Sequence, residues 1–169
     1  IQYRPDGNDF VCVNGKNRYT RALYGGITDF RIETSDRPVF AAYKPKDSKH
    51  ICFRLQCGNQ SIALDSLKFC EARYRAGRRT YRLTDPLLGK GELNISVLAF
   101  PDAEGGIWRF TMKDMPEGAL LHCYISEIRA KNLSRNGDMG ADRADSFDAP
   151  QLPKEQKHYK LSLDGTTAY

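Results

Sequence analysis

Hydrophobic and polar residues alternate along residues 17–43, which carry the sequence NRYTRALYGGITDFRIETSDRPVFAAY. In the middle of this stretch, an extended chain places Phe30, Ile32 and Thr34 on one side. It places Arg31, Glu33 and Ser35 on the other side. A period of two residues is typical of a β-strand with one buried face and one solvated face. Glycine pairs and proline favour turns, and they stand at residues 25–26 and 36–38. The stretch therefore predicts three strands joined by two turns.

Similar alternation recurs along most of the chain. Turn residues such as Gly58-Asn59-Gln60 separate the segments, and Leu93, Ile95 and Val97 are expected to point inward from one of them. The further strands are expected within residues 50–57, 61–74, 79–83, 92–100, 107–112 and 119–128. Eight or nine strands at regular spacing, with no convincing helix between them, predict an all-β fold, an antiparallel β-sandwich.

The length of the chain fits one domain. With 169 residues, 40% of them hydrophobic, it is long enough to bury a core without metal or disulfide support. No apolar run approaches the roughly 20 residues that a membrane-spanning helix needs. The first residue is Ile1, no leader peptide is visible, and strand-like residues KHYKLSLD lie close to the last residue. We therefore expect residues 1–169 to form a single β-sandwich domain, an N-terminal fragment of a larger multidomain protein.

Residues 131–155 differ from the rest in being polar and poor in strand-forming residues. Long loops inside compact domains are commonly functional or flexible. Several carboxylates here offer hard oxygen ligands for a structural calcium ion, above all Asp138, Asp142 and Asp145, with Asp148 nearby. The spacing does not match an EF-hand, and Arg135 and Arg143 would compete for the same carboxylates. A surface loop held by turns and ion pairs is the alternative, and no other cofactor is indicated.

The net charge of +5 comes with arginines gathered around one predicted hairpin. They are Arg73, Arg75, Arg78, Arg79 and Arg82. Clustered cations neutralise phosphates in nucleic-acid-binding proteins. Alternation places Tyr74 on the face opposite Arg73 and Arg75, whereas a stacking surface needs rings and cations together. We therefore interpret the arginines as a solvated hairpin face and expect no nucleic-acid partner.

The cysteines and histidines indicate no reactive centre. The five cysteines form no CxxC pair, so a zinc site is a poor interpretation of them. Cys70 and Cys123 share a face with apolar neighbours, so buried free thiols are expected, with Cys52 or Cys57 in a disulfide as the alternative. His50 lies two residues from Cys52, but closeness in sequence does not make an activated pair.

Sugar chemistry is the remaining candidate activity. Asp102 and Glu104 lie close together, but in a turn where acids usually remain solvated. Aromatic side chains that stack on sugar rings are a second route, and Trp108, Tyr24 and Tyr124 are the candidate carbohydrate-binding residues. A tryptophan in a strand is more often part of the core. No phosphate-binding loop, dinucleotide fingerprint, nucleophile elbow or HExxH motif is present.

Five segments together carry a family resemblance. They are NRYTRALYGG, FRIETSDRPVFAAY, EARYRAG, TDPLLGKGELNISVLAFPDAEG and LSRNGDMGADRADSFDAP. Over nearly the whole chain they resemble an uncharacterised N-terminal β-domain family of large Bacteroidetes proteins that are glycosidase-like. The resemblance implies a sandwich of the supersandwich or galactose-mutarotase-like type, ahead of an α/α toroid that carries catalysis. It also implies a periplasmic or cell-surface setting, in which five cysteines are an unusual number.

Our leading hypothesis from the sequence is a non-catalytic β-sandwich module of a carbohydrate-active protein. Its main partner would be a C-terminal catalytic domain of the same polypeptide, whose substrate cleft the module helps to shape. One alternative is an independent carbohydrate-binding module that binds an oligo- or polysaccharide. The other is a glycoside-acting enzyme in its own right, although no catalytic residue is indicated.

Overall fold

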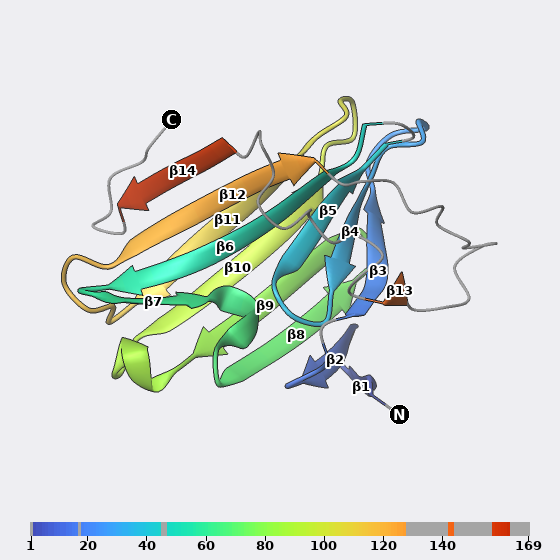
Figure 1. The fold of residues 1–169 in the computed structure, drawn as a ribbon. Helices are drawn as coiled ribbons and strands as arrows, with labels where there is room; N and C mark the ends of the chain where they lie inside the picture. Colours follow the sequence, from blue (N-terminus) through green and yellow to red (C-terminus); the bar gives the residue numbers. More distant parts are fainter. Residues whose placement is uncertain (1, 17, 45–46, 128–141, 144–156, 163–169) are drawn as a thin grey trace.

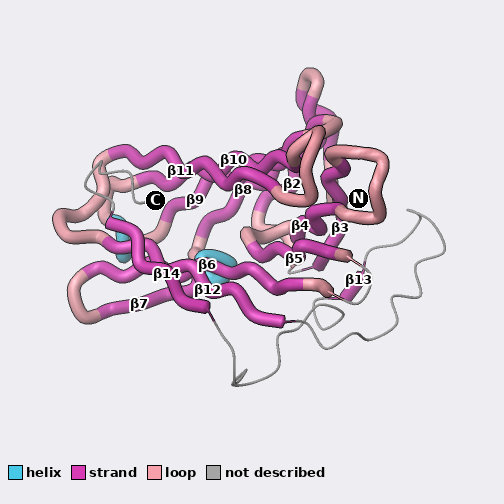
Figure 2. Tube along the Cα trace, turned by 90° about the horizontal axis from the view of Figure 1, so that it is seen from above, coloured by secondary structure: helices cyan, strands magenta, loops and turns pink. Residues whose placement is uncertain are grey.

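A computed structural model describes residues 2–16, 18–44, 47–127, 142–143 and 157–162, with the last two ranges described as backbone strands only. Nearly all regular structure in these residues is antiparallel β-strand, arranged as two sheets that face each other (Figures 1 and 2). The helical content of the described part is two short 3-10 turns, Leu64–Ser66 and Pro86–Leu88. The predicted all-β sandwich is confirmed.

The first sheet has the strand order β1-β2-β8-β9-β10-β11. Its strands are β1 (Arg4–Asp6), β2 (Asp9–Val13), β8 (Phe69–Arg75), β9 (Arg78–Thr84), β10 (Glu92–Ala99) and β11 (Gly106–Lys113). The β8–β9 hairpin turns at Gly77, whose φ of 80° lies in the left-handed region that glycine favours. The last four strands follow the chain order, and β10 and β11 pair in register over their whole length.

The second sheet has the order β13-β3-β4-β5-β6-β12-β14, with β7 paired to β6. Its strands are β3 (Arg18–Tyr24), β4 (Arg31–Ser35), β5 (Val39–Tyr43), β6 (Lys49–Cys57), β7 (Gln60–Ala63), β12 (Leu120–Glu127), β13 (Asp142–Arg143) and β14 (Lys157–Ser162). The three strands predicted within residues 17–43 are β3, β4 and β5. The segment predicted over residues 61–74 is divided, because the 3-10 turn at Leu64–Ser66 moves the chain from β7 in the second sheet to β8 in the first.

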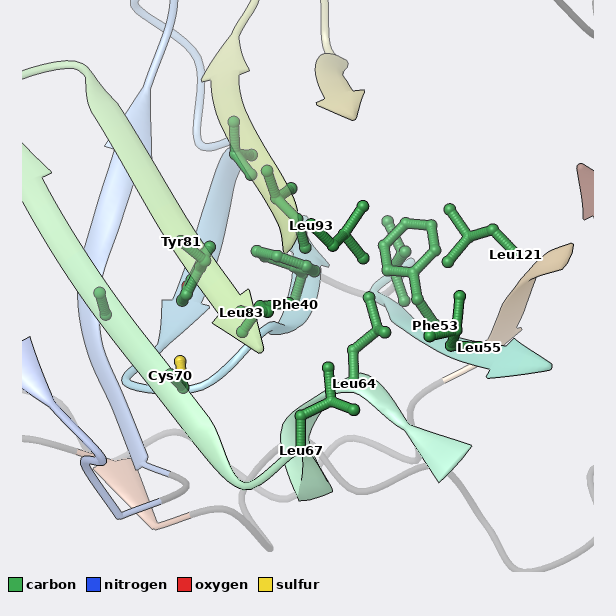
Figure 3. Close-up of a cluster of buried hydrophobic side chains, with 14 of the residues drawn as sticks. Phe40, Phe53, Leu55, Leu64, Leu67, Cys70, Tyr81, Leu83, Leu93 and Leu121 are labelled. Carbon is green, nitrogen blue, oxygen red and sulfur yellow. The ribbon is translucent and has the colours of Figure 1, made fainter. Parts of the chain in front are cut away.

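The hydrophobic core fills the space between the sheets (Figure 3). Phe40 lies at its centre, with ring centroids 6.1 Å from Phe53 and 5.7 Å from Tyr81 in edge-to-face geometry. Leu93, Ile95 and Val97 of β10 are at most 1% exposed, which confirms their predicted inward orientation. Edge-to-face aromatic pairs add to the stabilisation that burial provides, so this centre joins the two sheets.

The β4 strand corrects one prediction. Glu33 and Ser35 were expected on a solvated face, but both are fully buried, as are Ile32 and Thr34 on the other face. The strand lies inside the second sheet between β3 and β5. On its outer side, a small apolar cluster of Tyr19, Val39 and Ala41 is also buried. Alternation in β4 therefore does not separate a buried face from a solvated face.

At one end of the sandwich, the β3–β4 loop and the β10–β11 turn lie against each other. A Cβ atom added to Gly25 would stand 1.6 Å from the carbonyl oxygen of Phe100, so only glycine fits there. Lys44, which follows β5, pairs with Glu104 in the β10–β11 turn at 2.5 Å. We call this end, formed by residues 24–30, 44 and 98–107, the loop tip. No helix long and apolar enough to cross a bilayer occurs among the described residues.

Candidate functional site

Trp108 lies on the inner face of β11, because it pairs with the buried Val97 of β10. Its ring packs edge-on against Phe40, with centroids 5.8 Å apart and an interplanar angle of 76°. The indole nitrogen Nε1 is buried and has no hydrogen-bond partner among the described residues. The structure therefore places this predicted sugar-binding residue, partly buried, against the core, and sugar binding by it stays a prediction.

Tyr24 and Tyr124, the other two predicted sugar-binding residues, point outward from the second sheet. Tyr24 is exposed at the end of β3, whereas Tyr124 in β12 is half-buried and stacks on His122, with centroids 6.4 Å apart. Strands β4, β5 and β6 separate them, a spacing of roughly 19 Å across the sheet. The three aromatic residues therefore form no shared platform, and sugar binding at either tyrosine stays a prediction.

The predicted calcium ligands cannot be assessed as a site. Asp138 and Asp145, like Asp148, lie outside the described residues, and Asp142 is described only as a backbone position in β13, paired with Tyr19. Within the described residues, no group of three or more His, Cys, Asp or Glu side chains is placed to hold a metal ion. The calcium site stays a prediction.

The arginine-rich hairpin is solvated on one face only. Arg73, Arg75 and Arg82 lie on the outer face of the first sheet and form ion pairs with acidic neighbours. Arg79 corrects the prediction, because its side chain is fully buried between the sheets. It pairs with Tyr74 across the hairpin, and Tyr74 belongs to the inward face of β8.

Arg79 is the centre of a buried polar cluster that connects the two sheets, which we call the inter-sheet cluster. The cluster consists of Tyr3, Thr20, Ser35, Asp36, Arg79 and Tyr81. Arg79 donates from Nη2 to the Tyr3 hydroxyl at 2.7 Å and to the Ser35 carbonyl at 3.0 Å, and from Nε to the Tyr81 hydroxyl at 3.3 Å. The Tyr81 hydroxyl donates to the same Ser35 carbonyl at 2.7 Å. One guanidinium group in β9 thus connects this strand to β4 and to the N-terminal segment.

Asp36 is the anionic partner in this cluster. Its Oδ1 lies 3.8 Å from Arg79 Nη2 and accepts hydrogen bonds from the hydroxyls of Tyr3 and Thr20, the latter at 2.5 Å. Gln2 donates to Oδ2 at 2.7 Å. Burial raises the pKa of Tyr3 to about 12, so its hydroxyl stays protonated and available as a donor. A protein core tolerates charged groups when they are paired with an opposite charge and hydrogen-bonded. The cluster therefore fits a structural role.

The surroundings of the five thiols disfavour their ionised form. All five cysteines are free, with Cys12 and Cys70 buried and the others half-buried. Burial raises the pKa of Cys52 to about 11 and those of Cys70 and Cys123 to about 12, and it also raises the pKa values of Cys12 and Cys57. The thiolate is the nucleophile, so these shifts suppress reactivity near neutral pH. Cys52 and His50 both point outward from β6, but the raised pKa of Cys52 is the opposite of thiol activation.

The β10–β11 turn carries two carboxylates, Asp102 and Glu104. Glu104 is engaged by Lys44, and burial of the turn is low, with both Asp102 and Glu104 exposed. The pairing raises the pKa of Lys44 through its hydrogen bond to Glu104. Glu104 therefore serves to connect the loops of the tip.

The outer face of the first sheet contains a hollow of about 250 Å³, which we call the outer hollow. It is lined by Glu71, Arg73, Thr80, Tyr81, Arg82, Asn94, Ile95, Ser96 and Thr111. Register explains its shape: Arg73, Thr80, Ser96 and Arg109 form one row across β8 to β11, with the two short side chains in the middle. A second row contains Glu71, Arg82, Asn94 and Thr111. Short residues flanked by long ones produce a polar depression.

Glu71 is the one carboxylate that lines the outer hollow. Arg73 Nε lies 2.8 Å from it and Arg82 Nη2 lies 3.5 Å from it. Partial burial on its own raises the pKa of Glu71, but these two guanidinium groups outweigh that effect and hold the pKa below its usual value. Glu71 is therefore an ionised and paired group rather than a proton donor.

Two further depressions lie beside the 3-10 turn Pro86–Leu88, with volumes of about 610 and 530 Å³. Both are lined by a single carboxylate, Asp85. Asp85 caps the turn, since Oδ1 accepts from the Leu87 amide at 2.9 Å and Oδ2 accepts from the Lys68 amide at 2.8 Å. Its role is accounted for by the backbone it stabilises.

Comparison with known proteins gives one match. A family model described as a domain of unknown function (DUF4450) matches residues 45–166. No curated protein and no solved structure matches the chain. The matched range runs from the β5–β6 loop past β14, so it includes the outer hollow and most of the first sheet, whereas Asp36 and the rest of the second-sheet side of the inter-sheet cluster precede it.

Proposed function

The chain belongs to the family of domain of unknown function DUF4450, and on that premise we propose that it is a non-catalytic β-sandwich module of a carbohydrate-active, glycoside hydrolase-like protein. In this proposal the module packs against a catalytic domain of the same polypeptide and helps to shape its substrate cleft. The resemblance to domains of large Bacteroidetes proteins supports a periplasmic or cell-surface setting. The raised pKa values of the thiols suit such a setting, because unpaired cysteines are tolerated where they do not react.

One observation carries the non-catalytic assignment. Glycoside hydrolysis uses two carboxyl groups that flank the scissile bond, roughly 5–9.5 Å apart. Each of the three depressions described above is lined by a single carboxylate, Glu71 or Asp85, and each of these is engaged by arginines or by backbone amides. The two buried carboxylates among the described residues, Glu33 and Asp36, lie beside Arg31 and Arg79. None of these groups is free to act as acid, base or nucleophile.

The loop tip is the surface that we assign to docking. It presents Tyr24 and Ile27 to solvent, with Ile27 fully exposed. The backbone beneath them is fixed by the close approach of Gly25 to Phe100 and by the ion pair of Lys44 with Glu104. A rigid apolar projection is suited to inserting into a neighbouring domain, because little conformational entropy is lost on docking.

The docking assignment is tested in the natural polypeptide by substituting Ile27→Glu. We expect the module and its neighbour to unfold as separate transitions in calorimetry, whereas the wild-type protein unfolds them together. The control is Val13→Glu, which places the same charge at another exposed apolar residue, away from the tip. Coupled unfolding that survives Ile27→Glu, or that is lost equally in Val13→Glu, would overturn the assignment.

A further inference from the structure

The floor of the outer hollow is built from short polar side chains. Thr80 pairs with Ser96, and Asn94 pairs with Thr111, so three hydroxyls and one amide are grouped over three adjacent strands. These groups both donate and accept hydrogen bonds, and the Asn94 amide already donates one to Glu92 at 2.8 Å. Such a floor is complementary to a ligand with many hydroxyl groups.

The β11 side of the hollow carries unused positive charge. Arg109 closes the row that contains Ser96, and Lys113 lies two residues beyond Thr111 on the same outer face. Both side chains are exposed, and neither forms an ion pair with another described residue. On the opposite side, Arg73 and Arg82 are already engaged by carboxylates. The free charge therefore favours an anionic group near β11.

An apolar strip borders the hollow on its tip side. Leu98 and Ile107 pair across β10 and β11 and are 41% and 48% exposed. They lie in the row next to that of Ser96 and Arg109. A ligand that spans these rows would meet the apolar strip first and then the row in which Ser96 lies beside Arg109.

We propose that the outer hollow binds an acidic oligosaccharide, with a uronate carboxylate held by Arg109 and Lys113. The hydroxyls of its sugar rings would bond to Thr80, Asn94 and Ser96, and the C–H faces of the rings would lie on Leu98 and Ile107. The row from Arg73 to Arg109 spans about 14 Å, which accommodates a short oligosaccharide across the strands. This inference adds a ligand to the proposed docking module, and its site is separate from Ile27, so either proposal can fail without the other.

A single-stranded nucleic acid is the competing polyanion. Its binding relies on aromatic rings that stack on the bases within a cationic groove. No aromatic side chain points out of the floor of the hollow, and Phe69 at its margin is covered by the guanidinium group of Arg82, 4.8 Å from the ring centroid. The chemistry of the hollow therefore favours a glycan.

The test is NMR titration of the chain with tetragalacturonate, followed at the amides of β9, β10 and β11. The hollow is small, so binding is expected to be weak and to require millimolar ligand. We expect shifts to concentrate on these strands and to decrease as salt is added, because salt screens exposed charges. Cellotetraose, a neutral oligosaccharide of equal length, should bind at least threefold more weakly.

Two variants locate the site. Arg109→Gln should weaken tetragalacturonate binding about three- to tenfold, through loss of a charge-assisted hydrogen bond. The matched control Arg4→Gln removes another exposed arginine, at the opposite edge of the same sheet, and should change affinity less than twofold. Ser96→Leu should abolish binding by filling the floor, without changing charge.

Four results would overturn the proposal. One is the absence of shifts with millimolar tetragalacturonate. Another is equal binding of cellotetraose, which would remove the role of charge. Equal shifts with sulfate alone would indicate an ion site rather than a glycan site, and tighter binding of a tetrathymidylate would indicate a nucleic-acid surface. Shifts that map only to strands other than β9–β11 would overturn the proposal in the same way as an absence of shifts.

Discussion

Replacing Arg79 by methionine should destabilise the fold far more than any other arginine substitution in the β8–β9 hairpin. The side chain is fully buried, and Asp36 depends on it for charge compensation at 3.8 Å. Methionine keeps much of the apolar volume but removes the charge and three hydrogen bonds, to Tyr3, Ser35 and Tyr81. What remains is a buried carboxylate with hydroxyl and amide donors but no cation.

The expected loss of stability follows from the cost of leaving one member of a buried ion pair without its partner. That cost is about 3–5 kcal/mol, out of a total stability of about 5–15 kcal/mol for a typical domain. For a chain of this size, 1 kcal/mol corresponds to about 2–4 °C in Tm, so the decrease should be about 6–20 °C. Thermal and urea unfolding followed by circular dichroism measure it.

Arg82→Met is the matched control, since Arg82 lies on the same strand but faces outward, with ion pairs of 3.5 Å to Glu71 and Glu92. Exposed pairs of this kind are worth at most about 1 kcal/mol. The double variant Arg79→Met/Asp36→Asn should lose less stability than the sum of its single variants, because the carboxylate no longer needs a cation. Equal effects of Arg79→Met and Arg82→Met would refute the assignment of Arg79 to the inter-sheet cluster.

Three further predictions concern the tip, the hollow and the thiols. Gly25→Ala should cost about 1–3 kcal/mol, because the new Cβ overlaps the Phe100 carbonyl, whereas Gly26→Ala, 3.2 Å from the Pro101 carbonyl, should cost much less in the same urea titration. The pKa of Glu71 is lowered in the folded state, so its stabilising effect is present above the unfolded value of about 4.3 and is lost as pH falls through the folded value. Glu71→Gln should therefore destabilise the protein at pH 7 but not at pH 2, while Glu117→Gln, at an exposed residue in the β11–β12 turn, should have little effect at either pH. The five thiols should react slowly with a disulfide reagent at pH 7.5 and all together in denaturant, because burial raises their pKa values; one thiol that reacts at the rate of a small peptide would contradict the burial described for it.

Alternation was sufficient to predict the sandwich, and it succeeded where one face of a strand is solvated. Leu93, Ile95 and Val97 were placed correctly because Asn94 and Ser96 mark the opposite face. It failed at β4, where both faces are buried and the polar residues on the outer side are held by other strands. Burial on both faces depends on neighbours that are distant in sequence, and periodicity carries no information about them.

The sequence contained a local signal for the inward orientation of Arg79, but the charge of the residue outweighed that signal in the prediction. Tyr81 and Leu83 are inward residues of the same strand, so a period of two places Arg79 inward as well. Its charge, together with four neighbouring arginines, suggested a solvated face instead. The partner Asp36 lies in a turn of the other sheet, and no local pattern pairs the two residues.

The outer hollow could not be predicted from sequence spacing. It depends on the register of four strands, which brings Thr80, Ser96 and Arg109 into one row. Register also decides the direction of Trp108, because pairing with Val97 turns its ring toward Phe40. Register across strands, rather than residue type, decided which side chains meet.

The central claim is that the chain contributes no catalytic group, and turnover by the purified 169-residue chain tests it most directly. The assay is release of reducing ends from a panel of neutral and acidic polysaccharides. Our account predicts no turnover above that of a heat-unfolded sample, with or without added calcium. Turnover that disappears on Glu71→Gln or on substitution of Asp85 would contradict it, because it would give a catalytic role to a carboxylate that we assign to structure.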